Sequence, residues 1–405
     1  MTPARTARPA TTYRRVPRTP ALDGLRALAI AAVALFHFPT RSVFMGGLFG
    51  VGLFFVLSGF LVTPILAAEH SREGRIRFGR YLRRRAWRLL PALGAFVLVV
   101  VVMTALFGRT GWFGSNPFGP PHAPGRPASV SESVGGAAAA LSYVYNFFLA
   151  MGVHMPLQFG HLWTLAVEGQ FYVLWALLAS WLLKRGPKVL IAATVALIAL
   201  SAAVPFIIWD PHGRHNWIYF GTTPRIQQLL SGALLAELWS LGVLRRIPRW
   251  VLRAAALAGT GAMFYLVFGV ANDTFKYLGA LTAVAGAGFV IVAHLIDDRG
   301  RSVTRAVLGS RPLVWLGQRS YAVYLWHWPM AIWTNELPRV IGVPLGLGAS
   351  LAAAEMSWRL VEAPASRLAH RREERRRAER EQVEQGQAER GRSGRGRAEM
   401  AEARP

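Results

Sequence analysis

Long apolar runs separated by short polar or basic segments form the main pattern along this chain. A helix needs roughly 20 residues to cross a hydrocarbon core of about 30 Å. A further apolar stretch, 137–150, is too short to do so. The pattern predicts an all-α integral membrane protein of about ten spans, at residues 22–40, 47–68, 87–107, 162–183, 188–209, 223–243, 251–271, 276–296, 319–338 and 342–361.

The distribution of charge predicts the topology. The formal net charge of +25 suggests nucleic-acid binding at first sight, but the basic residues cluster in alternate loops, which excludes that interpretation. The loops 108–136, 210–222, 272–275 and 339–341 nearly lack them. By the positive-inside rule both termini are cytoplasmic and 137–150 is a re-entrant or outer-surface helix. The basic clusters are Arg5–Arg18, Arg72–Arg88, Lys184–Lys188, Arg245–Arg253, Arg299–Arg311 and the segment after Arg367.

Composition completes the outline. We expect a basic cytoplasmic leader at 1–20, a membrane domain at 21–367 and a charged, disordered cytoplasmic tail at 368–405. Arginine far outnumbers lysine, as in proteins of GC-rich bacterial genomes, so we expect a multi-pass protein of a bacterial cytoplasmic membrane. The chain has no cysteine, which excludes disulfides, thiolate nucleophiles and cysteine metal sites.

Ionisable side chains inside membrane spans are costly, so they mark candidate functional sites. Arg26 and His37 are eleven residues apart in the first span, which places both on one helix face about 16 Å apart along the axis. With Arg26 near the cytoplasmic boundary, His37 lies about halfway through the membrane. A lone histidine in an apolar helix is usually a packing residue, but the arginine on its face favours a functional role.

Two more ionisable residues are predicted at the depth of His37. Glu168 lies about 10 Å below His161 in the fourth span, and His327 lies about 12 Å above Arg319 in the ninth. We therefore expect one polar pocket, in which the Glu168 carboxylate orients the His37 imidazole and stabilises its protonated form. A structural hydrogen-bond network between helices is the alternative for Glu168 and His327.

Arginines at two further places are candidate ligands. Arg84, Arg85 and Arg88 precede the third span at a spacing that brings them onto one patch. Topology alone accounts for arginine there, and bidentate phosphate binding accounts for it equally well. Arg225 lies at the outer start of the sixth span, against the positive-inside bias, and is a candidate for the pocket or for acceptor binding.

Six motifs occur in a recognisable order between residue 21 and about residue 367. They are Asp23-Gly24-Leu25-Arg26 with His37; Gly50-Val51 through Phe54-Phe55-Val56-Leu57-Ser58-Gly59-Phe60-Leu61; Arg84-Arg85-x-x-Arg88-x-x-Pro91; Leu162-Trp163-x-Leu165-x-Val167-Glu168-x-Gln170-Phe171-Tyr172; Tyr321-x-x-Tyr324-Leu325-Trp326-His327-x-Pro329; and Glu362-x-Pro364-x-x-Arg367. With these motifs the chain resembles the acyltransferase 3 family, bacterial multi-span O-acyltransferases that act on surface glycans, lipid-linked sugars and macrolides.

The resemblance implies a ten-helix fold, an acyl-CoA donor that enters from the cytosol, and a role for Arg26 and His37 in catalysis and donor placement. It implies that the arginines before Pro91 bind the donor's phosphates. We expect His37, oriented by Glu168, to deprotonate an acceptor hydroxyl that attacks the acyl-CoA thioester. Direct transfer and an acyl-histidine intermediate both stay open. The expected donor residues are Arg26, Arg84, Arg85 and Arg88, and the further candidates for the pocket or the acceptor are Asp23, Ser58, Arg225 and His327.

The expected partners are acyl-CoA as co-substrate, the lipid bilayer and a sugar-containing acceptor, without a metal or a tightly bound cofactor. The acyl group is expected to be acetyl, and the acceptor a cell-surface glycan, a glycolipid or a macrolide-type metabolite. The family commonly has acidic residues where this chain has Gly52 and Gly169, which bears on pocket polarity and acceptor choice. No esterase-like domain is fused to this sequence, so the single-domain form is expected.

The alternatives to an enzyme are a membrane transporter and a non-catalytic membrane scaffold. The transporter makes the more specific use of the ionisable residues. His37, Glu168 and His327 would then form a proton relay through the bundle. The sequence shows neither an internal repeat nor paired spans broken by glycine or proline, which are typical of such transporters.

Overall fold

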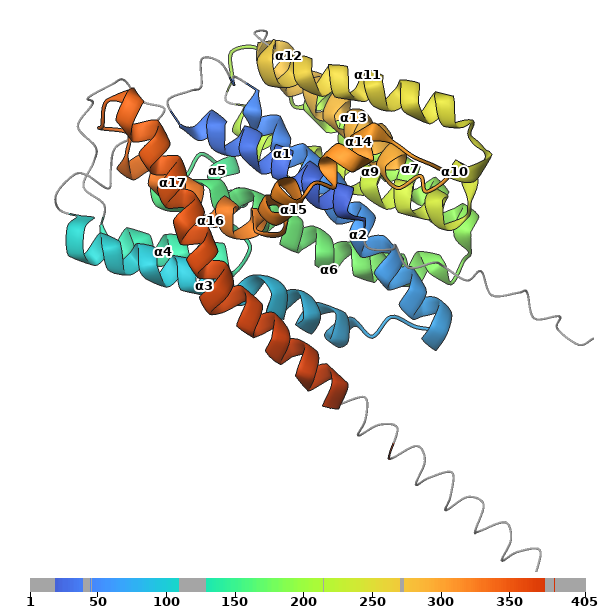
Figure 1. Ribbon diagram of the computed structural model, residues 1–405, viewed down its shortest axis with the longest axis horizontal. Helices are drawn as coiled ribbons and strands as arrows, with labels where there is room; N and C mark the ends of the chain where they lie inside the picture. The colour runs from blue at the N-terminus through green and yellow to red at the C-terminus, as the bar shows by residue number, and fades with distance from the viewer. Residues whose placement is uncertain are drawn as a thin grey trace, which may run out of the picture.

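The computed structural model describes residues 19–38, 44, 46–108, 129–213, 215–269, 273–375 and 382, and all regular elements within these ranges are helices (Figure 1). The predicted leader up to residue 18, most of the loop 108–136 and the tail beyond Arg375, apart from residue 382, lie outside the described residues.

The elements follow one another as an array of long helices joined by short turns and short helices. Their bounds are α1 Pro20–His37, η1 Gly47–Phe49, α2 Gly50–Glu73, α3 Phe78–Phe107, α4 Val130–Leu141, α5 Tyr145–Ala150, η3 Leu157–Leu162, α6 Trp163–Leu183, α7 Pro187–Ile207, α8 Asn216–Phe220, α9 Thr222–Ser240, α10 Val243–Arg246, α11 Arg249–Phe268, α12 Asp273–Leu278, α13 Ala280–Leu295, α14 Val303–Leu308, α15 Arg311–Gln318, α16 Ser320–Trp333, α17 Arg339–Ser357 and the π-helical turn η4 Trp358–Glu362. The last helix continues through η4 to Arg375.

Seven helical segments of the described chain are long and apolar enough to cross a membrane. They coincide with seven of the ten predicted spans: 22–40, 47–68, 87–107, 162–183, 188–209, 251–271 and 342–361. The other three predicted spans are also helical. However, α16 has 14 residues and α13 has 16, after a break at Gly279, while the 19-residue α9 carries Arg225, Gln227, Gln228 and Glu237.

Helix α9 is polar because it lies inside the bundle. It packs against α2, α6, α7 and α13, so little of it needs to be apolar toward lipid. The closest approach is to α2, where a Cβ on Gly59 would lie 1.8 Å from the carbonyl oxygen of Leu229 and one on Gly232 would lie 1.9 Å from that of Val56. Small residues of this kind let two helix backbones come into contact in a membrane.

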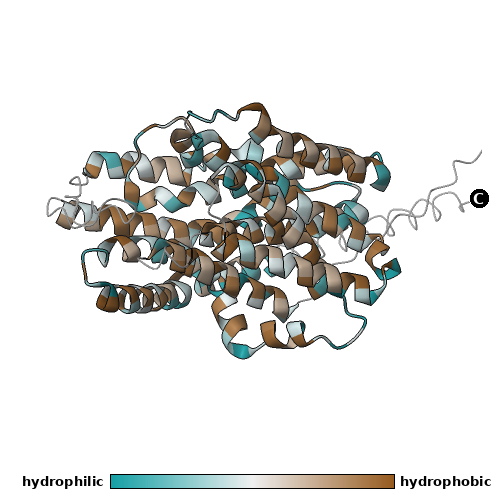
Figure 2. Cartoon of the chain, turned by 90° about the horizontal axis from the view of Figure 1, so that it is seen from above, coloured by the Kyte–Doolittle hydropathy of each residue, from teal (hydrophilic) through white to brown (hydrophobic). Residues whose placement is uncertain are grey.

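The outer surface of the bundle is apolar along the helices. Figure 2 shows hydrophobic residues over much of the helix lengths and hydrophilic ones mainly toward helix ends. Large apolar side chains are exposed on the peripheral helices, among them Leu98, Leu200, Leu257 and Leu360. Such a surface is costly in water and is satisfied by lipid tails.

Two local features bear on the sequence predictions. The stretch 137–150 forms the end of the 12-residue α4 and the 6-residue α5, separated at Tyr143, whose φ of 57° is unusual for a residue with a side chain. Helix α3 begins at Phe78, nine residues before the predicted start of the span. The arginines 80–88 therefore lie on a continuous helix.

Candidate active site

Three of the cavities among the described helices hold the candidate site residues. The arginine cavity has a volume of about 590 Å³ and is lined by Arg26, Arg80, Arg84, Arg85 and Arg88. The tyrosine cavity, of about 90 Å³, shares Arg26, Arg85 and Arg88 with it and adds Ser58, Glu168, Tyr172, Tyr321 and Tyr324. The histidine cavity, of about 460 Å³, is lined by His37, His161, Trp163, Arg225 and Trp328. Arg26 and His37 thus face different cavities.

His37 ends α1 and forms a pair with His327 of α16. Nε2 of His327 lies 3.0 Å from Nδ1 of His37, and Nδ1 of His327 lies 2.7 Å from the carbonyl oxygen of Tyr324. Because a carbonyl oxygen only accepts, Nδ1 of His327 carries the proton and its neutral Nε2 accepts from Nδ1–H of His37. The remaining nitrogen of neutral His37, Nε2, then holds a lone pair, as a base or a nucleophile needs.

A third histidine, His161, lies beside this pair. Its ring centroid is 5.6 Å from that of His327, and it is 3% exposed. Neither of its ring nitrogens has a hydrogen-bond partner within the described chain. From the sequence, His161 is expected only at the start of a span, although its place just before the Leu162-Trp163 motif is a signal of a role.

Glu168 lies in the tyrosine cavity. Its carboxylate accepts hydrogen bonds from the hydroxyls of Ser58 and Tyr172, and α6, which carries it, packs against α2. The structure therefore brings His37 together with His327, which was predicted as a pocket residue, and joins Glu168 to Ser58 instead of to His37.

A wall of bonded groups connects the linings of the tyrosine and histidine cavities. The hydroxyls of Thr164 and Tyr324 are 2.5 Å apart, and Tyr324 also donates to the carbonyl oxygen of His161. Thr164 and Tyr324 line the tyrosine cavity, while His161 lines the histidine cavity. These bonds tie α6 and α16 together where the two cavities come together.

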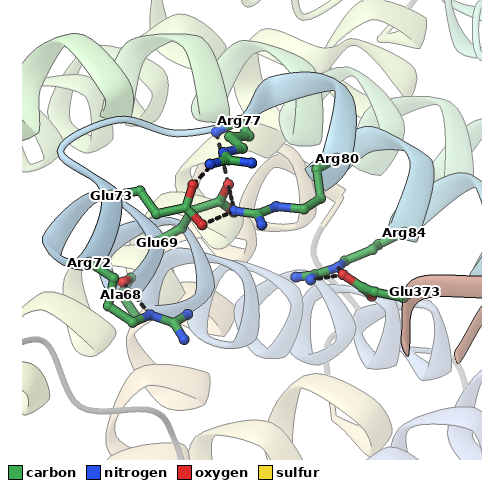
Figure 3. Close-up of polar contacts among 8 residues, drawn as sticks. All are labelled: Ala68, Glu69, Arg72, Glu73, Arg77, Arg80, Arg84 and Glu373. Carbon is green, nitrogen blue, oxygen red and sulfur yellow. Dashed lines mark hydrogen bonds and ion pairs between the residues drawn. The ribbon is translucent and has the colours of Figure 1, made fainter. Parts of the chain in front are cut away.

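Acidic residues neutralise part of the arginine cluster (Figure 3). Arg80 binds Glu69 at 2.8 Å and also Glu73, and Nε of Arg77 lies 2.5 Å from Glu73. These ion pairs join the end of α2 to the start of α3. The arginines that make them serve the structure of this turn.

Arg84 has a partner from the far end of the chain. Its Nε lies 2.8 Å and 2.9 Å from the two carboxylate oxygens of Glu373, on the last helix (Figure 3). Arg85 and Arg88 form no ion pair within the described residues, although Glu168 and Glu362 lie near Arg88 and the guanidinium of Arg85 lies over the Tyr172 ring at 4.8 Å. The cavity therefore presents Arg85 and Arg88 to an anionic ligand, whereas Arg84 must first leave Glu373.

The remaining predicted positions are also placed. Asp23 lies 3.4 Å from Arg26 in an ion pair on α1. Neighbouring residues fill the space beside the two glycines that depart from the family pattern. A Cβ on Gly52 would lie 2.3 Å from Val284, and one on Gly169 would lie 2.3 Å from the Tyr143 ring.

Comparison with known proteins decides the family. The family model described as an acyltransferase domain, that of acyltransferase 3, matches residues 19–354. The chain belongs to the acyltransferase 3 family. This membership confirms the family predicted from the motifs and the assignment of the chain to the acyltransferases.

Named relatives of this acyltransferase 3 chain come from bacteria. It is 32% identical to the peptidoglycan O-acetyltransferase OatA of Listeria monocytogenes over 85% of this chain and 55% of that protein. It is 30% identical to the O-acetyltransferase OatA of Staphylococcus aureus and to the putative peptidoglycan O-acetyltransferase YrhL of Bacillus subtilis, over 85% of this chain and 57% and 54% of those proteins. The chain thus spans about half the length of these relatives. No solved structure matches it.

Proposed function

We propose that this chain transfers an acetyl group from acetyl-CoA, bound at the arginine cavity, to a hydroxyl of a sugar-containing acceptor in the histidine cavity. The observation that carries the proposal is the His37–His327 pair, which lies at a 460 Å³ cavity lined by His37 in a member of an acyltransferase family. The names of the relatives support acetyl as the group and a cell-wall glycan as the acceptor class.

The donor side follows from the unpaired arginines. Phosphate groups bind guanidinium groups bidentately, with hydrogen bonds strengthened by charge. Arg85 and Arg88 line both the arginine and the tyrosine cavities, so they can hold the CoA phosphates at the entrance of the narrower space. We place Glu168 on this donor path, where its bonds to Ser58 and Tyr172 fix the side chains that the pantetheine arm must pass.

The chemical step uses the histidine pair. Nε2 of His37 takes the acceptor proton as the hydroxyl oxygen attacks the thioester carbonyl carbon. The C–S bond then breaks, and the CoA thiolate leaves. Positive charge on His37 is stabilised because its Nδ1–H donates to neutral His327. His161 is our candidate for stabilising the oxyanion.

The same nitrogen, Nε2 of His37, can instead attack the thioester and carry the acyl group as acyl-histidine before the hydroxyl accepts it. Acid quenching of the enzyme mixed with acetyl-CoA alone, followed by intact-mass measurement, separates the two routes. Direct transfer leaves the protein mass unchanged.

The proposed arrangement has a defined orientation. With ten spans and both described ends of the chain on the cytoplasmic side, the arginine cavity opens toward cytosolic acetyl-CoA and the histidine cavity toward the outer face. The three helices that fall short of a full span by length or composition, α9, α13 and α16, are largely buried. They pack against other helices of the bundle.

Transfer can be tested on the purified chain in lipid nanodiscs with isotope-labelled acetyl-CoA and soluble peptidoglycan fragments. The expected product is a labelled ester that is released by mild alkali and is missing with His37→Ala. An unlabelled fragment pool with a folded protein, or full activity in His37→Ala, would overturn the proposal. Proton-coupled solute uptake into liposomes without ester formation would favour the transporter.

A further inference from the structure

The histidine cavity contains a buried cation in addition to its histidines. Arg225 lies in the first turn of α9 and is 2% exposed. Its guanidinium carbon lies 5.0 Å from the ring centroid of Trp163 and 4.9 Å from that of Tyr219, and its Nε donates to the carbonyl oxygen of Tyr219 at 2.9 Å. The two rings and this bond hold the guanidinium in place.

No carboxylate neutralises this cation within the described part of the chain. None of the residues that line the histidine cavity is acidic, and a second cation, Lys276, lines the same space. A buried charge without an acidic partner is costly, and ring contacts offset only part of that cost. The hydrogen bond to Tyr219 uses Nε, so the two terminal amino groups keep donors for a ligand.

The remainder of the cavity wall suits a sugar. Aromatic rings line it from several helices, including Trp163, Tyr219, Phe220, Tyr277 and Trp328, and flat apolar faces of this kind pack against the C–H faces of a pyranose. Its 460 Å³ lies within the usual range for small-molecule sites, about 300–1,000 Å³. His37 and Arg225 line this one volume, so a single ligand can reach both.

We propose that Arg225 is the anion-binding residue of the acceptor subsite, and that the natural acceptor carries a carboxylate or a phosphate close to the hydroxyl that is acylated. The proposal rests on the acyl transfer proposed above and narrows its acceptor class. The anion binds the guanidinium bidentately, which directs the hydroxyl of the same sugar toward Nε2 of His37. The carboxylate of a sugar acid and the phosphate of a sugar phosphate share this chemistry.

Matched acceptors test the subsite on the full chain. N-acetylmuramic acid is compared with its neutral methyl ester, and N-acetylglucosamine 1-phosphate with neutral N-acetylglucosamine, with acetyl-CoA as donor and ester formation measured by mass spectrometry. We expect the anionic member of at least one pair to have a kcat/KM about 10- to 100-fold higher, as for one charged hydrogen-bond pair. The pair that shows the preference identifies the source of the anion.

Variants locate the preference. Arg225→Gln should raise the KM of the anionic acceptor about 10- to 100-fold, leaving kcat and the KM of the neutral acceptor and of acetyl-CoA within about twofold. Arg225→Lys keeps the positive charge but lacks the bidentate guanidinium, so the KM of the anionic acceptor should rise less than in Arg225→Gln. Arg253→Gln, an exposed arginine bonded to the Arg301 carbonyl, serves as the control and should change nothing.

The outcomes separate this inference from the wider proposal. Equal turnover of both members of each pair by the unmodified chain would overturn the anion subsite while leaving acyl transfer in place. Equal loss for neutral and anionic acceptors in Arg225→Gln would make Arg225 a structural residue. Absence of ester with every sugar would instead overturn the transfer to sugars itself. Should Arg225→Gln fail to fold, the comparison of matched acceptors with the unmodified chain still decides.

Discussion

His327 is predicted to support catalysis through His37, and the geometry sets the size of the effect. Nδ1–H of His37 donates to Nε2 of His327 at 3.0 Å. When Nε2 of His37 takes a proton, this becomes a hydrogen bond from a charged donor, worth about 1.5–3 kcal/mol. His327→Leu removes the acceptor, so kcat should fall about 10- to 100-fold, with the KM of acetyl-CoA nearly unchanged.

The conservative variant discriminates this role from a purely structural one. The amide oxygen of a glutamine reaches about as far as Nε2 of a histidine, so His327→Gln should recover much of kcat. His37→Ala should cost at least about 100-fold, and the double variant should be hardly slower, because residues that act as a unit are not additive. His294, 9% exposed and 3.1 Å from Ser302, offers a matched buried histidine, so His294→Leu is the control.

Steady-state kinetics with saturating acceptor, together with thermal unfolding of each variant, gives the answer. Two results would refute the pairing. One is a His327→Leu protein that keeps kcat within twofold. The other is a loss in His327→Leu that multiplies with that of His37→Ala, since independent effects would mean that His327 does not act through His37.

Other predictions concern the donor site and the topology. Arg85→Ala should raise the KM of acetyl-CoA about 10- to 100-fold through a lost phosphate contact. Arg83→Gln, exposed on the same helix, should leave this KM unchanged. Equal effects of the two variants would mean that these arginines only set the orientation of the chain in the membrane. Glu373→Gln should lower that KM by up to about fivefold, the worth of a partly exposed ion pair, because its arginine partner becomes available; a rise in KM would contradict this. The chain has no native cysteine, so an impermeant maleimide on intact cells should label His212→Cys but not Lys188→Cys, and the reverse would invert the proposed orientation.

The helices were largely predictable because lipid imposes a strong pattern on them. All ten apolar runs proved helical, and the three helices that fell short of a full span are largely buried, where contact with protein relaxes the demand for length and apolarity. Composition cannot reveal which helix is interior, and therefore it could not predict that α16 would have only 14 residues.

The site was predictable in its members more than in its pairings. Counting residues along an axis gives depth, and it placed Glu168 and His327 near the depth of His37. Which of them meets His37 depends on the rotation of each helix and on its neighbours: α16 packs against α1, whereas α6 packs against α2. For the same reason, spacing could not tell which arginines have acidic partners, since Glu373 lies 289 positions from Arg84.

The wall formed by Thr164, Tyr324 and the His161 carbonyl has a consequence for the proton gradient across the membrane. When a membrane protein has cavities that open to both sides, chains of hydrogen-bonded water can carry protons through it. Thr164, Tyr324 and the His161 carbonyl are already hydrogen-bonded to one another. They are therefore less available to bind such a chain of water. In the proposed transfer, these bonds between the linings of the donor and acceptor cavities limit the leakage of protons while the acyl group changes sides.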